Sequence, residues 1–363
     1  MSAITVYILI LIGMAFLSFG MNRGVRYRKL CFVLAFILAF VFFALIKPGT
    51  DYVSYEAYYN NFVFRDLITS DQEPGYVLLN CVLKLFIKDS AIGIAVINTL
   101  TLVVSFCAIY SLRERIDLGA SVFSWFCIQY FTGYIIAMAL AASFVLLGMS
   151  LLLRKKDVKA LISFLIASSL HFTALLVVAF FVCYKLIGNG GKSKLKRWVI
   201  IVLLFAATFA LPWLIELLMK LLPAFAKYRK YTHDLGRSFG FGQLIIYVPV
   251  WFSLYYLDCN CTRDEIFRKV YDSFVWEGFS IAMMAYVIGM LDRMFVYFSS
   301  AFIFLVPYVI RHHRENRGNL KFALLKPRVD AFLFGVYCVM RFGLFMYEHY
   351  RMSGLDEIVF IWQ

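Results

Sequence analysis

The chain has 363 residues, of which 63% are hydrophobic and only 16% charged, and its mean hydropathy is +0.79. These values lie far outside the range of soluble globular proteins, so they exclude an ordinary soluble enzyme and predict an integral membrane protein. The net charge of +14 comes from 36 Lys and Arg against 22 Asp and Glu. Most of the eight cysteines lie in apolar runs, which is typical of buried thiols and not of a disulfide framework.

Apolar stretches along the chain predict an all-α, polytopic fold with about twelve transmembrane helices in one domain over residues 1–363. A spanning helix needs roughly 20 mainly apolar residues. The predicted spans lie near 3–20, 30–46, 91–112, 118–132, 135–153, 158–170, 172–187, 198–222, 242–258, 273–291, 294–310 and 329–347. The first stretch has no positive segment before it and no small-residue cleavage site after it, so we expect a retained helix and not a signal peptide.

Six clusters of Lys and Arg set the predicted orientation, because short cytoplasmic loops collect positive charge. They hold 24 of the 36 basic residues and lie at 23–29, 113–115, 154–159, 185–197, 263–269 and 311–328. The twelve-span assignment places all six clusters on the cytoplasmic side and both termini outside.

This topology requires two irregular segments. Residues 74–88 must not cross the membrane, and their pattern predicts an amphipathic helix in the outer interface. Its apolar face would hold Tyr76, Leu79, Val82, Leu83 and Phe86, with Asn80, Lys84 and Lys88 elsewhere on the helical wheel. Residues 158–187 are too short for two full spans, so we expect two half-helices that meet at "SLHF", where irregular backbone lines a cavity.

Three outward segments combine cations with aromatic side chains: the loop 47–90, the loop 223–242 and the hairpin 290–298. Arg and Lys bind phosphate oxygens and aromatic faces stack on sugar rings, so together the segments predict a site for a phosphorylated, glycan-bearing lipid. The predicted substrate-binding residues are Tyr52, Tyr55, Lys227, Arg229, Lys230, Tyr231, Arg237 and Tyr297. The alternative is that these cations bind lipid head groups and the tyrosines form an aromatic belt.

Four further residues carry the predicted chemistry. Asp51 and Glu73 are held by turns beside the interface, and each is a candidate general base; the alternative for Asp51 is a helix cap. His171 is a candidate phosphate ligand or proton acceptor, or else a satisfied core residue. Arg293 is a candidate phosphate ligand, or else it only neutralises Asp292.

No metal site is predicted. The chain has no D-x-D motif, the usual metal clamp of nucleotide-sugar transferases. Cys259 and Cys261 form a C-x-C for which we expect no nearby histidine ligand, and His312 and His313 are expected to be solvated in a basic loop.

The order of several short motifs resembles the EpsG-like (Wzy-type) polysaccharide polymerases over roughly residues 30 to 310. In chain order the motifs are "GTDYVSYEAYY", "EPGYVLLN", "IIAMALAAS", "ASSLHFTALL", "KYRKY" and "DRMFVYF". The resemblance assigns family motif positions to Asp51, Tyr52, Tyr55, Glu73, Pro74, His171, Tyr228, Tyr231 and Arg293. One departure is that the family usually has an Arg just before the "IAMAL" stretch, which "FTGYIIAMAL" lacks; Arg229 or Arg237 is the expected substitute.

The resemblance implies a metal-independent, GT-C-like glycosyltransferase in the bacterial inner membrane, with its active site facing the periplasm. It would join oligosaccharide repeat units carried on undecaprenyl pyrophosphate into O-antigen, capsule or exopolysaccharide. Expected partners are that lipid-linked glycan, membrane lipids and, as an open alternative, a chain-length regulator; no nucleic acid and no cofactor are expected. The rival predictions are a flippase or transporter of the same lipid, and an O-antigen ligase or acyltransferase.

Overall fold

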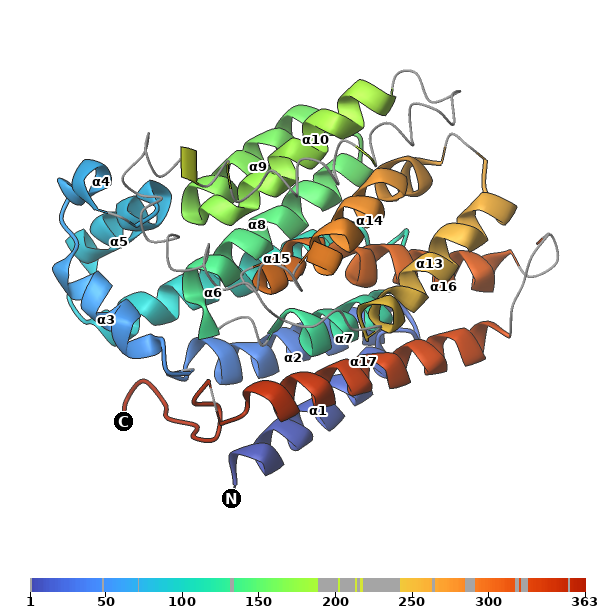
Figure 1. Cartoon of the computed structure of the whole chain (residues 1–363). Helices are drawn as coiled ribbons and strands as arrows, with labels where there is room; N and C mark the ends of the chain where they lie inside the picture. The colour runs from blue at the N-terminus through green and yellow to red at the C-terminus, as the bar shows by residue number, and fades with distance from the viewer. Residues whose placement is uncertain are drawn as a thin grey trace.

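The computed structural model is a bundle of α-helices (Figure 1). It describes residues 2–47, 49–70, 72–130, 134–188, 202, 213, 216–217, 242–262, 265–284, 291–316, 320, 326–351 and 353–363. Its helices are α1 (Ala3–Gly20), α2 (Val25–Ala39) with η1 (Phe40–Ala44), α3 (Tyr52–Asn61), α4 (Asp66–Thr69), α5 (Pro74–Phe86), α6 (Ser90–Ser111), α7 (Leu118–Ile128), α8 (Ile136–Leu153), α9 (Asp157–Leu170), η3 (Phe172–Ala174), α10 (Leu175–Gly188), α13 (Gly242–Asn260), α14 (Ile266–Met284), α15 (Leu291–Phe298), η5 (Ala301–Leu305), α16 (Val306–Glu315) and α17 (Pro327–His349). The described residues contain one isolated antiparallel bridge, Ile46 with Phe360, and no strand.

Six helical stretches within this part of the chain are long and apolar enough to cross a membrane. They are Ala3–Gly20, Val25–Ala44, Ser90–Ser111, Ile136–Leu153, Met294–Glu315 and Arg328–His349. The all-α class and the polytopic membrane character predicted from the sequence are therefore confirmed. The twelve-span count stays a prediction, since the expected span at 198–222 lies almost wholly outside the described residues. The helix pair expected in 158–187 is present as α9 and α10, which meet at His171.

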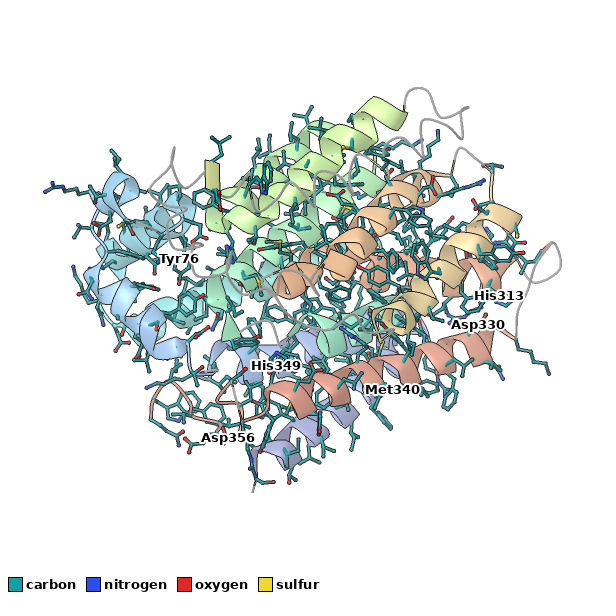
Figure 2. All side chains as sticks on the ribbon, in the orientation of Figure 1. Tyr76, His313, Asp330, Met340, His349 and Asp356 are labelled. Atoms are coloured by element: carbon teal, nitrogen blue, oxygen red, sulfur yellow. The ribbon has the colours of Figure 1, made fainter. Side chains whose placement is uncertain are left out.

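The described parts of the basic clusters lie together at one end of the bundle, here called the basic end. Arg28 pairs with Glu114 at 3.4 Å, and Arg115 pairs with Glu265 at 3.1 Å. A guanidinium nitrogen of Arg311 donates to the carbonyl oxygen of residue 113 at 2.7 Å. The opposite end carries α3, α4, α5 and the segment after α17, and Figure 2 shows Tyr76 and His313 far apart along the bundle. The clustering of positive charge that the sequence predicted is thus present in the fold.

Two predictions about the basic end were wrong: that His312 and His313 are solvated, and that no histidine lies near Cys261. His313 is buried and bonded to Asp330, beside which Figure 2 shows it, and His312 is half-buried. Nδ1 of His312 lies 3.0 Å from the hydroxyl of Tyr256, and its Nε2 lies 3.7 Å from Sγ of Cys261. Both histidines lie on α16, which packs against α13 and α17, so they are enclosed rather than solvated. Groups of three or more potential metal ligands do not occur in the described part of the chain.

The predicted wheel of the helix at 74–88 was also wrong in detail. In α5 the buried residues are Tyr76, Val77, Asn80 and Cys81, while Leu78, Val82, Leu85 and Phe86 are exposed. Asn80 tolerates burial because its amide nitrogen donates to the carbonyl oxygen of Tyr76 at 2.7 Å. Lys84 donates to the carbonyl oxygens of Asn60 and Phe62 at the end of α3, so it holds α3 against α5 instead of offering a free cation.

Candidate active site

Glu73 and His171 form the centre of the site, although 98 residues separate them in the sequence. Nδ1 of His171 lies 2.8 Å from Oε1 of Glu73. The Glu73 side chain is 3% exposed and that of His171 is 17% exposed. A carboxylate can only accept hydrogen bonds, so with Glu73 ionised the proton of the ring must sit on Nδ1. In this tautomer a neutral imidazole presents Nε2 as a lone pair, which is the arrangement of an oriented general base.

The "EPG" stretch explains how Glu73 reaches this position. Glu73 occupies the N-cap of α5 in an extended conformation, and its carbonyl oxygen accepts the backbone N–H groups of Tyr76 and Val77. Its carboxylate makes no capping bond and turns to His171 instead. Pro74 follows at the first helical position, where a fixed φ is favourable and no N–H is needed.

Gly75 lets α5 approach α9 closely. A Cβ atom at Gly75 would lie 2.4 Å from Oγ of Ser169 and 2.7 Å from its backbone carbon and oxygen. No side chain fits at such distances, so glycine is required for the start of α5 to lie on the last turn of α9. This contact brings the residue after α9, His171, beside the residue before α5, Glu73.

The break between α9 and α10 fixes the imidazole. α9 ends at Leu170, and His171 is extended, with φ −153° and ψ 115°. Its backbone N–H still donates to the carbonyl oxygen of Ala167 at 2.9 Å, which ties the residue to the helix end. The chain then makes the 3₁₀ turn η3 before α10 begins. The side chain of His171 therefore does not follow the helical periodicity of α9 or of α10.

Tyr297 joins the same site from α15. Its hydroxyl shares a 2.9 Å hydrogen bond with Oγ1 of Thr173, two residues after His171, and its side chain is buried. The carboxylate of Glu73 is close enough to Tyr297 to act on it electrostatically. Arg293 precedes Tyr297 by four residues, so the two attach to the same face of α15; the side chain of Arg293 lies outside the described residues.

Tyr52 and Tyr55 support the site from inside the fold. Both are buried, at 3% and 9% exposure. Tyr55 packs edge-on against Tyr76 at a centroid distance of 5.8 Å, and its hydroxyl takes part in a hydrogen bond with the backbone of Ala137 at the start of α8. Burial, reinforced by the neighbouring Tyr76, raises the pKa of Tyr55 well above its ordinary value, so its phenol is neutral at physiological pH. The predicted role of these tyrosines in sugar binding stays a prediction.

Asp51 occupies the N-cap position of α3, but its side chain makes no capping hydrogen bond. The capping alternative is therefore not what the geometry shows. Asp51 and Glu73 both act electrostatically on Tyr55. The remaining predicted binding residues, Lys227, Arg229, Lys230, Tyr231 and Arg237, lie outside the described residues.

Sequence reasoning missed three contributors to the site. Thr173 stands two residues after His171 but carries no recognisable signal of its own. Gly75 was taken only as part of a turn, whereas it is a packing requirement. Residues 353–361 contact the loop before Asp51, and the two glycines at that contact, Gly49 and Gly354, were the available signal.

Comparisons with known proteins agree with this assignment of elements. The model of the EpsG family matches residues 28–349, which include Asp51, Glu73, His171 and Tyr297. Neither the curated proteins nor the solved structures contain a match.

Proposed function

This chain belongs to the EpsG family, a family of Wzy-like polysaccharide polymerases, and we propose that it joins oligosaccharide repeat units carried on undecaprenyl pyrophosphate. The product would be O-antigen, capsule or exopolysaccharide, made at the periplasmic face of a bacterial inner membrane. The observation that carries the proposal is the Glu73–His171 pair at the end of the bundle opposite the positive clusters. That end is the outer one if positive charge marks the cytoplasmic side.

The proposed reaction is a single glycosyl transfer. The growing chain on its pyrophosphate lipid is the donor, and a hydroxyl of the non-reducing sugar of one lipid-linked repeat is the acceptor. The acceptor oxygen bonds to the anomeric carbon while the bond from that carbon to the pyrophosphate oxygen breaks. The acceptor proton moves to the enzyme, and undecaprenyl pyrophosphate leaves with the bonding electrons.

The geometry favours His171 as the group that takes the proton. Its Nδ1 is occupied by Glu73, which leaves Nε2 for the acceptor hydroxyl. Glu73 is then the orienting residue, which holds the ring and stabilises the imidazolium formed during transfer. Asp51, which also acts electrostatically on Tyr55, is the competing candidate for the base.

The leaving pyrophosphate requires positive charge nearby, since a departing anion is stabilised by prearranged cations. We assign this role to Arg293 together with Arg229 or Lys230, which the sequence places in outward segments. Without a D-x-D motif in the chain, the proposed transfer relies on these side chains and uses no divalent metal.

Two other functions predict different products from the same lipid-linked repeat. A flippase would move the lipid between leaflets without lengthening its glycan. A ligase would pass the glycan to a different acceptor, so no ladder of repeat units would form. The buried carboxylate–imidazole pair favours the polymerase, because transport alone needs no oriented base.

The test uses the full chain in nanodiscs supplied with lipid-linked repeat units and EDTA. A product ladder spaced by one repeat is expected from the wild type. His171→Ala should slow ladder growth by roughly 10²- to 10⁴-fold and Glu73→Gln by about 10²-fold, the usual range for removing general-base assistance. Arg293→Ala should remove long chains. His349→Gln is the matched control, because the ring of His349 stacks on Phe345 and is not bonded to Glu73. A wild-type ladder that persists in His171→Ala would refute the assigned base, and lipid transfer between leaflets without a ladder would refute the polymerase.

A further inference from the structure

The segment after α17 folds back onto the loop that leads into Asp51. We call residues 353–361 the strap. The backbone N–H of Thr50 donates to the carbonyl oxygen of Ser353 at 3.0 Å, and that of Lys47 donates to Val359 at 2.8 Å. The backbone N–H of Ile361 donates to the carbonyl oxygen of Leu45 at 3.0 Å. Three backbone hydrogen bonds therefore hold the strap along residues 45–50. The loop donates two of them and the strap donates one.

The crossing between strap and loop has no room for side chains. Gly49 and Gly354 both adopt left-handed backbone conformations, with φ of +75° and +67°. A Cβ atom at Gly49 would lie 2.7 Å from the carbonyl oxygen of Ser353 and 2.9 Å from Cβ of Tyr134. A Cβ atom at Gly354 would lie 3.1 Å from the backbone nitrogen of Thr50. Two glycines placed back to back satisfy both the conformation and the close contact.

The strap contacts the chain immediately before the site. Thr50 is the residue before Asp51, and α3 starts at Tyr52. One turn later Tyr55 bonds to the start of α8 and packs on Tyr76, three residues after Glu73. A change in the position of the strap would therefore move Asp51 directly, and would reach Glu73 through Tyr55 and Tyr76.

We propose that the strap is a positioning element of the polymerase reaction, which sets Asp51 and the first turn of α3 against the lipid-linked sugar. This proposal rests on the function proposed above. The family match ends at residue 349, so the strap lies beyond the matched region. Gly354 is the positioning residue through which it is best tested, because it touches the loop without lying next to Glu73 or His171.

The test is a double-mutant cycle between Gly354 and Asp51, read as the rate of ladder growth in nanodiscs. Gly354→Val places a β-branched residue at a positive φ and should slow growth by about tenfold or more. Gly354→Asn tolerates that conformation better but keeps the Cβ contact with Thr50, so it should recover part of the lost rate. Asp51→Asn should lower the rate by itself, and Gly354→Val should then add little, because a strap that acts through Asp51 has nothing left to position.

Two further variants distinguish a loss of positioning from a loss of folding. Ile361→Pro removes the N–H that bonds Leu45 and should lower the rate while the thermal midpoint stays near that of the wild type. Asp356→Ala, at an exposed position of the same segment, is the control and should behave as wild type. Fully additive losses in the cycle, no loss in Asp51→Asn, or an unchanged rate in both Gly354→Val and Ile361→Pro would overturn the strap while leaving the polymerase intact. A wild type that makes no ladder would overturn the proposed function and the strap with it.

Discussion

Replacing Gly75 by alanine should separate Glu73 from His171 without touching either side chain. The new Cβ would lie 2.7 Å from the backbone carbon and oxygen of Ser169, and ordinary contact begins at 3.4 Å. Because backbone atoms cannot rotate away, the start of α5 must move by about 0.7 Å. If that movement is taken up along the Glu73–His171 bond, its length rises from 2.8 Å to about 3.5 Å, which is beyond a useful hydrogen bond.

The expected result is a loss of ladder growth of up to about 100-fold, the cost of a misplacement near 1 Å in a catalytic site. The thermal midpoint should fall as well, since overpacking costs about 1–3 kcal/mol. Gly335→Ala is the matched control, because a Cβ there meets nothing within 4 Å. Adding Ser169→Ala to Gly75→Ala removes only the hydroxyl and leaves the backbone contact, so it should not restore the rate. Wild-type growth in Gly75→Ala, or an equal loss in Gly335→Ala, would show that this close approach does not hold the pair.

Three further predictions follow from other contacts. Tyr297→Phe removes the bond to Thr173 and should lower stability in a membrane by about 0.6 kcal/mol, measured by thermal unfolding against wild type; no change would mean that the bond is not formed. Asp117→Ala should destabilise the fold by about 0.5–2 kcal/mol, since it removes the N-cap hydrogen bond that the carboxylate accepts from the backbone N–H of Ala120, and a protein that unfolds at the wild-type temperature would contradict this. Burial raises the pKa of Cys261 to about 11, so its thiolate should appear only as pH rises towards that value. Peptide-resolved alkylation should therefore be slow at pH 8.5, and reaction there at the rate of a free thiol would refute the raised pKa.

The parts of the fold that could be predicted from the sequence are those that depend on whether individual residues prefer water or lipid. Runs of apolar residues gave the helices, and the positions of Lys and Arg gave the end at which Arg28, Arg115 and Arg311 now meet. Each of these signals is carried by residues next to one another in the chain. The break at His171 also belongs here, since a single span over residues 158–187 would place the next basic cluster outside.

Most of the remaining parts depend on contacts between residues that are far apart in the sequence. Asn80 was expected away from the apolar face because it is polar, yet a bond to its own helix allows it to be buried. His312 and His313 were expected in solvent because they were placed in a basic loop, yet they bond to Tyr256 of α13 and Asp330 of α17. The pairing of Glu73 with His171 across 98 residues could not be predicted from either motif alone. It depends on the Gly75–Ser169 contact, which is visible only in three dimensions.

Three of the four candidate catalytic residues share one feature that explains why the site is at the end of the bundle. Asp51 and Glu73 are N-cap residues, and His171 is a C-cap residue. A polar side chain inside a spanning helix would be exposed to lipid or would need a partner on another helix, at a considerable cost. At a helix end the backbone leaves the helical spacing, so the side chain can be aimed freely while the bundle behind it stays rigid. A site built in this way can change its specificity through its loops without altering the spans, provided that the close contacts at Gly49, Gly75 and Gly354 are kept.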